Sequence, residues 1–179
     1  MLLKIVFALV AIVVVFVIIV ATRPPDYRVT RSIIVAVPPA AAFAQVNDFH
    51  NWNTWSPWAK IDPSMAQTYE GAPSGTGAIY AWTGNNKVGQ GRMTITDSRT
   101  NELVRINLEF IKPFPSTAIT EFTFKPENNQ TSITWTMTGK HTFTSKAMDL
   151  VVGMDKMIGP AFEQGLNQLK SVSEATSKK

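Results

Sequence analysis

The chain begins with a run of hydrophobic residues that contains no charge. From Ile5 to Thr22 the sequence is almost entirely aliphatic. As a helix, this run would rise about 27 Å, close to the roughly 30 Å of a bilayer's hydrocarbon core. A transmembrane anchor over residues 1–22 is therefore predicted. A cleaved signal peptide and a buried core helix are the alternatives. The apolar region of a signal peptide is normally shorter, about 7–15 residues, and Ile19-Val20-Ala21 is a poor cleavage site.

After the hydrophobic run, the pattern changes to alternation. Residues 23–28 contain Pro24 and Pro25, which disfavour a helix and predict a short extended spacer. Residues 27–37 are β-branched and alternate between apolar and polar positions, which predicts a strand. Pro38 and Pro39 end this strand.

Two short helical segments are predicted next. Residues 40–49 place their apolar side chains at helical spacing. Trp52, Trp55 and Trp58 follow at intervals of three, which aligns side chains on one face of a tight helical turn. We interpret this cluster as the wall of a cavity, with Trp55 and Trp58 facing inward and Trp52 packing between the helices. Sugar stacking and insertion into the membrane interface are the other interpretations.

From residue 65 to residue 139 short strands alternate with turn sequences rich in Gly, Asn and Pro. Residues 103–110 alternate most cleanly, and residues 131–137 place Ile133, Trp135 and Met137 on one face and hydroxyl side chains on the other. Regular short strands with one apolar face predict an antiparallel sheet of about six further strands, covered on one side.

The C-terminal segment supplies the predicted cover. A helical stripe of apolar residues begins after Ser145, a predicted N-cap, and reaches Leu169. The pattern predicts one long helix, kinked at Gly159-Pro160. A polar tail follows over residues 173–179. The whole is an α+β fold, with one domain over residues 29–172 preceded by the anchor and the spacer.

Charge and composition exclude several classes of protein. The formal net charge is +4, but between residues 23 and 177 there are 14 basic and 13 acidic residues. No basic stripe remains, so nucleic-acid binding is not expected. The chain has no cysteine and only two histidines, His50 and His141, which lack a second ligand at metal spacing. We therefore expect no metal and no cofactor. The charges that flank the hydrophobic run are too balanced to fix its orientation, so the side of the membrane stays open.

The order of elements is a strand, two short helices, about six antiparallel strands and a long helix. It resembles the helix-grip fold of the START-like superfamily, also called SRPBCC, and within it the polyketide cyclase/dehydrase-like subgroup. The segments that carry the resemblance include "VGQGRMTITD" and "TSITWTMTG". Similar segments are residues 46–71, 108–127 and 153–170. The resemblance implies a deep apolar cavity between the concave face of the sheet and the long helix.

The cavity is expected to be lined by aromatic and methionine side chains. The predicted ligand-binding residues are Trp55, Trp58, Trp82, Phe110, Phe122, Trp135, Met137, Met154 and Met157. Arg92 and Asp155 are candidates for polar groups inside the cavity. Arg92 is a candidate only if its face of the strand, and not that of Met93, points inward. Asp155 is a candidate because it falls within the apolar stripe of the helix, where a buried carboxylate needs a partner. No catalytic residue is predicted.

These observations predict a membrane-tethered domain that binds an apolar small molecule or a lipid. The soluble domain would lie close to the bilayer on a single-pass anchor. One alternative is a cyclase- or dehydratase-like enzyme that uses the same cavity. Another is an interaction module whose tryptophan face docks on a membrane protein. An enclosed cavity favours the first two over the third, and converging polar groups inside it would favour the enzyme.

Overall fold

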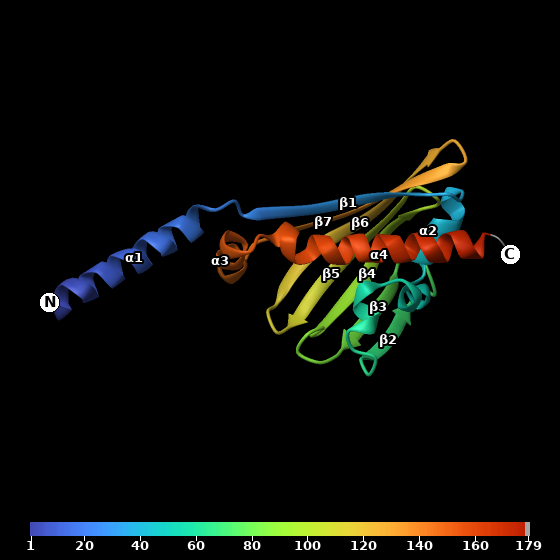
Figure 1. The fold of residues 1–179 in the computed structure, drawn as a ribbon. Helices are drawn as coiled ribbons and strands as arrows, with labels where there is room; N and C mark the ends of the chain where they lie inside the picture. The colour runs from blue at the N-terminus through green and yellow to red at the C-terminus, as the bar shows by residue number, and fades with distance from the viewer. Residues whose placement is uncertain (178–179) are drawn as a thin grey trace.

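The computed structural model describes residues 1–177, and its elements follow the predicted order. The long apolar helix α1 (Leu2–Thr22) projects away from a domain built on one curved sheet (Figure 1). Within α1, only Val20 is buried. The mean hydropathy of its most apolar stretch is 3.4, so the helix is long and apolar enough to cross a membrane. An almost fully exposed helix does not fit the alternative of a buried core helix.

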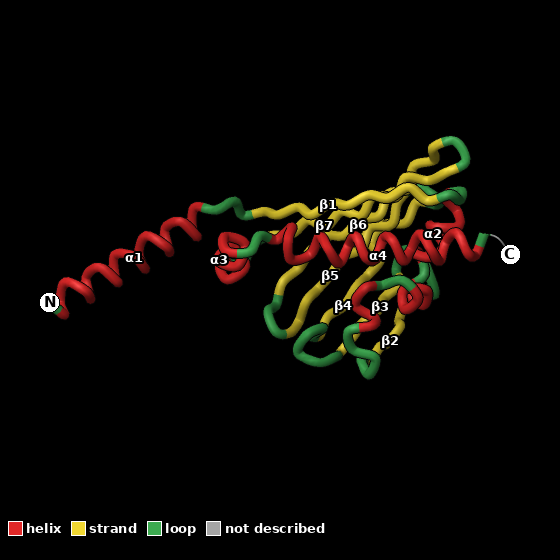
Figure 2. The backbone as a smooth tube through the Cα atoms, viewed as in Figure 1, coloured by secondary structure: helices red, strands yellow, loops and turns green. Residues whose placement is uncertain are grey.

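Seven antiparallel strands form the sheet, in the order β1-β7-β6-β5-β4-β3-β2. Consecutive strands from β2 to β7 are neighbours, and β1 closes the far edge against β7 (Figure 2). Their bounds are β1 (Asp26–Val35), β2 (Ala66–Gly71), β3 (Ala78–Thr83), β4 (Gln90–Arg99), β5 (Leu103–Lys112), β6 (Ser116–Glu127) and β7 (Gln130–Lys140). The alternation of burial along β5 and β7 gives the sheet one apolar, concave face.

Three short helices connect β1 to β2. They are α2 (Pro39–Asn47), η1 (Phe49–Thr54) and η2 (Pro57–Lys60), where η marks a 3-10 helix. Pro38 and Pro39 end the strand and start α2, because proline fits the first turn of a helix and removes a strand donor. Asp48 then caps η1 by accepting a hydrogen bond from the backbone N–H of His50 at 2.9 Å.

The last helix, α4 (Met154–Thr176), lies across the concave face and along β1 (Figure 1). Phe162, Leu166 and Leu169 point into the core from this segment. The antiparallel sheet, the short helices and the long C-terminal helix confirm the predicted helix-grip α+β fold.

The C-terminal segment is nevertheless two helices, α3 (Phe143–Val151) and α4 (Met154–Thr176), and the prediction of one long helix was wrong. The chain breaks at Gly153, whose φ of 86° is readily adopted by glycine alone. The carboxylate of Asp149 accepts a hydrogen bond from the N–H of Met154 at 2.6 Å and so caps the second helix. Pro160 lies inside α4 without ending it.

The predicted N-cap of this segment was also wrong. The N-cap of α3 is Thr142, whose hydroxyl accepts a hydrogen bond from the N–H of Ser145 at 3.2 Å. The predicted polar tail is largely helical, because α4 continues to Thr176 and buries Ser173. Residues 178–179 of that tail lie outside the described residues.

Candidate functional site

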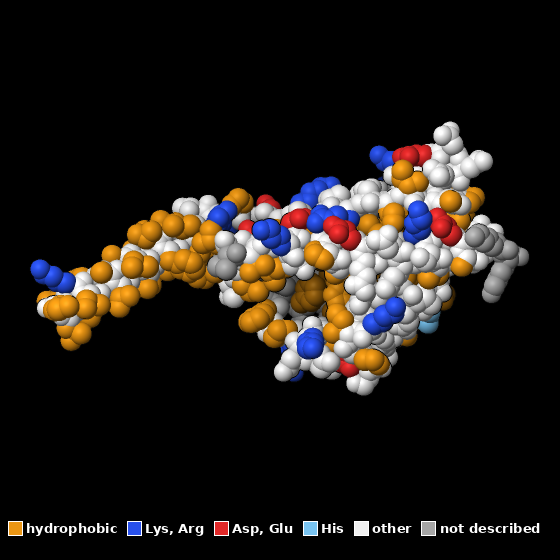
Figure 3. Space-filling model, viewed as in Figure 1, with side chains coloured by type: hydrophobic (Ala, Val, Ile, Leu, Met, Phe, Trp, Pro, Cys, Tyr) orange, Lys and Arg blue, Asp and Glu red, His pale blue; other side chains and the backbone are white. Residues whose placement is uncertain are grey.

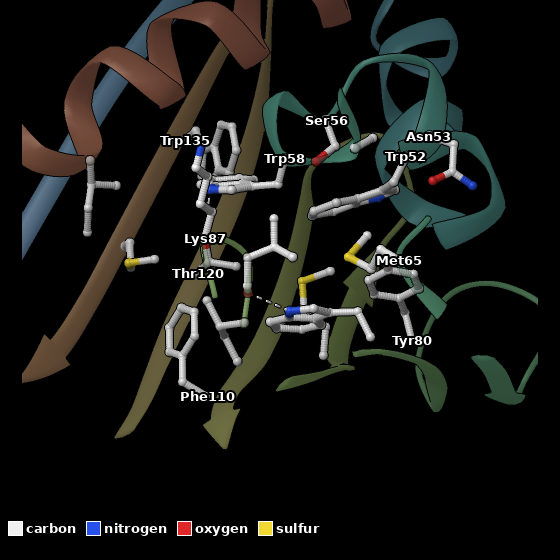
Figure 4. A pocket seen from close by; sticks show the side chains of 17 residues that line it. Trp52, Asn53, Ser56, Trp58, Met65, Tyr80, Lys87, Phe110, Thr120 and Trp135 are labelled. Atoms are coloured by element: carbon white, nitrogen blue, oxygen red, sulfur yellow. Dashed lines mark hydrogen bonds between the residues drawn. The ribbon is translucent and has the colours of Figure 1, made fainter. Parts of the chain in front are cut away.

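A cavity of about 290 Å³ lies between the concave face of the sheet and the helices. This volume is close to the lower end of the range for small-molecule sites, roughly 300–1,000 Å³. Figure 4 shows side chains converging on it from η1, η2, the sheet and the β3–β4 loop. The lining is formed by Trp52, Asn53, Ser56, Trp58, Ala59, Met65, Tyr80, Trp82, Lys87, Val88, Met93, Leu108, Phe110, Thr120, Trp135, Met137 and Ile158.

Trp135 forms the floor of the cavity and is fixed by its neighbours. Its ring stacks nearly parallel on Phe162 of α4, with ring centroids 3.9 Å apart, and packs on Phe122 at 4.7 Å with the two rings inclined by 29°. Its indole N–H donates a hydrogen bond to Oγ1 of Thr120 at 2.7 Å. Offset aromatic stacks of this kind add to the stability gained from burial. The sheet and α4 therefore hold this ring between them.

The three clustered tryptophans have different positions. The indole N–H groups of Trp52 and Trp55 donate to the backbone carbonyls of Val46 and Gln45, at 2.9 and 3.1 Å, and so attach the 3-10 segment to α2. Trp55 is completely buried in the core and does not line the cavity, whereas Trp52 and Trp58 do. The break between η1 and η2 at residues 55–56 interrupts the even spacing of three on which the sequence prediction relied.

Trp58 differs from the other tryptophans in its hydrogen bonding. Trp82 donates to the carbonyl of Val88 at 3.0 Å, so Trp52, Trp55, Trp82 and Trp135 all have acceptors. Within the described residues, no acceptor is bonded to Nε1 of Trp58, which is half-buried in the cavity wall. A donor in an apolar wall can orient the polar end of a bound molecule.

The described lining places no charged side chain in the interior of the cavity. Lys87 is the one charged side chain in the described lining, and it is exposed on the β3–β4 loop. Burial raises the pKa of the Tyr80 phenol to about 12, with a smaller contribution from Tyr69. Tyr80 is therefore a neutral hydrogen-bonding group at physiological pH. General acid–base catalysis needs a group that changes protonation near the operating pH, and the described lining offers no pair of such groups.

The structure brings together five of the nine predicted ligand-binding residues. Those in the lining are Trp58, Trp82, Phe110, Trp135 and Met137. Trp55 and Phe122 are fully buried in the core. Met154 borders a separate small pocket, and Met157 is exposed. On α4 it is Ile158 that lines the cavity, and Met157, one residue earlier, lies on a different face of the helix.

The two polar candidates do not enter the cavity. On β4 it is Met93 that faces inward, so Arg92 lies on the opposite face of the sheet, paired in register with Glu109. Asp155 is exposed and binds Arg31 of β1 through two hydrogen bonds of 2.8 and 2.9 Å. Arg31 lowers the pKa of the Asp155 carboxyl by hydrogen bonding to its charged form. The apolar stripe of the helix thus carries an ion pair that faces β1.

Several lining residues were missed by the sequence prediction. Tyr80, Leu108 and Met93 follow from the alternation of β3, β5 and β4 once the inward face is known. Alternation alone leaves two choices of face for each strand, and the pairing of the strands decides between them. Met65 and Val88 lie in connections between elements, where no periodicity exists to place them.

Residues 26–174 match the sequence family described as polyketide cyclase / dehydrase and lipid transport. The chain belongs to this family. The match covers the sheet and nearly all of α4, and it begins after α1. Within the described residues there is no cluster of three or more histidine, aspartate or glutamate side chains that could hold a metal ion.

Solved structures share the fold at low sequence identity. A protein from Nitrosospira multiformis is 16% identical, with a TM-score of 0.61 over 86% of this chain and 100% of the other. The protein CV1439 from Chromobacterium violaceum is also 16% identical, with a TM-score of 0.59 over 85% of this chain and 99% of that one. DynU16, from the dynemicin biosynthetic locus, is 15% identical with a TM-score of 0.55, over 82% of this chain and 47% of its own. A search of curated protein sequences finds no match.

Proposed function

We propose that this protein is a membrane-tethered binding domain for an apolar small molecule or a lipid. The observation that carries the proposal is the cavity of about 290 Å³, whose described lining is rich in aromatic and methionine side chains and has its charged residue, Lys87, at the rim. A ligand that enters it exchanges water for apolar surface, which is the main favourable term in such binding. Membership of a family whose description includes lipid transport supports the same ligand class.

The proposed ligand has one polar end that accepts a hydrogen bond. The indole N–H of Trp58 is the donor for it, and Lys87 at the rim can approach the same end. The deeper lining, with Met93, Leu108 and Trp135, offers only apolar contacts to the remainder of the molecule.

The proposed tether is α1. Its apolar length fits the hydrocarbon core, and all but its C-terminal end, which contacts α3, stands clear of the domain. Attachment to a bilayer raises the effective concentration, at the domain, of any ligand that is dissolved in that bilayer. Linking two binding partners has the same effect in general. Resistance of the full-length chain to extraction from membranes at alkaline pH tests the tether. Release into the soluble fraction contradicts it.

The binding proposal is tested with the full-length protein in lipid nanodiscs and an apolar fluorescent probe. Trp58→Ala removes about 1.5–3 kcal/mol of apolar contact, which corresponds to a roughly 10–150-fold weaker affinity. Ile119→Ala, an exposed change on the opposite face of the sheet, is the control and leaves affinity unchanged. Equal probe affinity in both variants contradicts the assignment of the site.

The same samples test the alternative of a cyclase or dehydratase. The family description and the biosynthetic locus of DynU16 are the observations that favour it. Polyketide-like carbonyl compounds are incubated with the protein and analysed by mass spectrometry. Compounds that are retained without conversion support a binding domain. Conversion that is lost in Tyr80→Phe assigns an enzyme to the cavity instead.

A further inference from the structure

We propose that the end of the domain next to α1 carries a lipid-docking surface, formed by Phe114, Phe143, Met148 and Val152. This inference rests on the proposed membrane tether and extends it from one helix to the domain itself. Its occupant is the interfacial region of the bilayer.

The position of α3 relative to the anchor is the first argument. Nζ of Lys146 on α3 donates a hydrogen bond to the backbone carbonyl of Ala21, at 3.4 Å, and the same end of α1 buries Val20 completely. Ala21 is one residue from the end of the apolar helix, where the chain leaves the hydrocarbon. A helix that contacts this point lies at the depth of the lipid headgroups.

Exposed apolar side chains are gathered at this same end. Phe114 is 64% exposed, Phe143 54%, Val152 49% and Met148 41%. Phe114, in the β5–β6 connection, and Met148, on α3, border one small pocket and therefore lie near each other despite their separation in sequence. In Figure 3 the hydrophobic surface of α1 is followed by hydrophobic side chains on the adjoining part of the domain. Exposed apolar side chains gathered at one end of a domain mark an interaction site.

The charges around the surface favour lipid as the occupant. Lys140 borders the same small pocket as Phe114 and Met148, Lys112 is two residues from Phe114, and Arg23 directly follows the anchor. Asp26, which pairs in register with Lys140, adds one negative charge at this edge. Asp149, an acidic residue of α3, already accepts a hydrogen bond from the N–H that starts α4. Apolar residues bordered by basic ones are the pattern of a surface that lies in the interface of an anionic membrane.

Docking in this way brings the cavity close to the bilayer. Met157 and Ile158 follow α3 by only one to two turns of α4, and Ile158 lines the cavity. Figure 3 shows a hollow with hydrophobic walls beside this part of the molecule. The surface therefore gives an apolar ligand a short path from lipid to cavity that does not cross water.

The absence of cysteine from the sequence makes a direct test practical. Single variants Phe114→Cys, Val152→Cys, Val13→Cys and Asn129→Cys of the full-length chain are labelled with an environment-sensitive fluorophore. They are placed in vesicles of phosphatidylcholine and phosphatidylglycerol. Residue 13 reports on the anchor, and residue 129, on the turn between β6 and β7, is the matched exposed control.

The labels at residues 114 and 152 are expected to be quenched by lipids that are brominated near the headgroup. Aqueous iodide is expected to quench these two labels severalfold less than it quenches the label at residue 129. Iodide quenching equal to that at residue 129 overturns the proposal. Protection from iodide without quenching by lipid also overturns it, because another protein surface then covers these residues. The label at residue 13 tests the tether separately. If lipid quenches this label while the labels at residues 114 and 152 are open to iodide, the tether is supported and only the docking surface is excluded.

Discussion

The guanidinium of Arg31 lies against the backbone of Gly159, at a place on α4 where a side chain would collide with it. A Cβ at residue 159 would overlap the Nη2 atom of Arg31. On either side, one turn away, Asp155 and Glu163 bind the same guanidinium, at 2.8 and 2.7 Å. Residues four apart share a helix face, so two carboxylates flank a gap that receives the arginine. This contact joins the edge strand β1 to the helix that closes the cavity.

The gap at Gly159 gives a prediction in which the effect of one substitution depends on a second residue. Residue 159 lies in a helix directly before Pro160, and the proline ring disfavours helical backbone for a preceding residue that has a Cβ, so Gly159→Ala gains little from helix propensity. With Arg31 present we expect it to lower the melting temperature further, because the added methyl displaces the guanidinium from Asp155. In an Arg31→Ala background the same substitution should lower it much less. Thermal unfolding of the four proteins measures the coupling, and an identical shift in both backgrounds would refute the contact.

The Arg31–Asp155 pair also predicts a dependence of stability on pH. Arg31 lowers the pKa of Asp155, so folding favours the ionised carboxyl. The resulting stabilisation is complete above the ordinary aspartate pKa of about 3.9 and disappears as the pH falls through the lower value in the folded protein. The wild type should therefore melt above Asp155→Asn at neutral pH, and the difference should shrink in acid. Glu127→Gln, at the exposed end of β6, controls for the loss of one charge. A difference that stays constant with pH excludes the linkage.

Trp55 and Trp58 are three residues apart but should respond differently to truncation. Trp55 is fully buried and bonded to α2, so Trp55→Ala should cost about 3–5 kcal/mol in the free energy of unfolding. Trp58 has protein on one side and the cavity on the other, so Trp58→Ala should cost less and mainly weaken probe binding. Chemical denaturation and probe titration together separate the two effects. Equal losses of stability would place both rings in the core.

The contrast between these two tryptophans shows how far sequence reasoning extends here. Alternation in residues 103–110 and 131–137 predicted the apolar faces of β5 and β7, because a half-buried strand has an unambiguous period of two. A 3-10 segment with a break has no such period, so the inward and core tryptophans could not be told apart. The sequence likewise located an acidic residue in the apolar stripe, but its partner, Arg31, is 124 residues away in the chain.

The division of the C-terminal segment into two helices could not be predicted from the sequence for a related reason. Gly159-Pro160 is the stronger helix-breaking signal in isolation, yet α4 continues through it while the chain breaks at Gly153. Packing decides the outcome: Phe162 and Leu166 must face the sheet together, which keeps the segment around Pro160 helical. Tertiary contacts of this kind override local propensity.

Gly91 should be intolerant of any side chain because it makes room for a cavity wall. A Cβ there would overlap the ring of Trp82, which pairs with it in register, and crowd the carbonyl of Glu109. Gly91→Ala should therefore cost about 1–3 kcal/mol, the usual range for overpacking, and reduce probe binding as Trp82 moves. Thermal unfolding and probe titration measure both. Adding Trp82→Leu to Gly91→Ala should restore part of the lost stability. If the double variant is no more stable than Gly91→Ala, the loss of stability comes from the contact with the backbone of β5 alone.

Removal of residues 1–22 should leave a folded domain. The sheet and α4 form a core in which α1 takes no part, and the truncation mainly removes the packing of Val20 and Ala21 beside α3. We expect residues 23–179 to be soluble and monodisperse, with the circular dichroism of the sheet and α4 intact and with α3 more open to hydrogen exchange than in the full-length chain. The Trp58 cavity should still bind an apolar probe added from solution. If the truncated protein lacks a cooperative thermal transition, α1 belongs to the folded unit. A core that is complete without α1 should stay folded when that helix is removed.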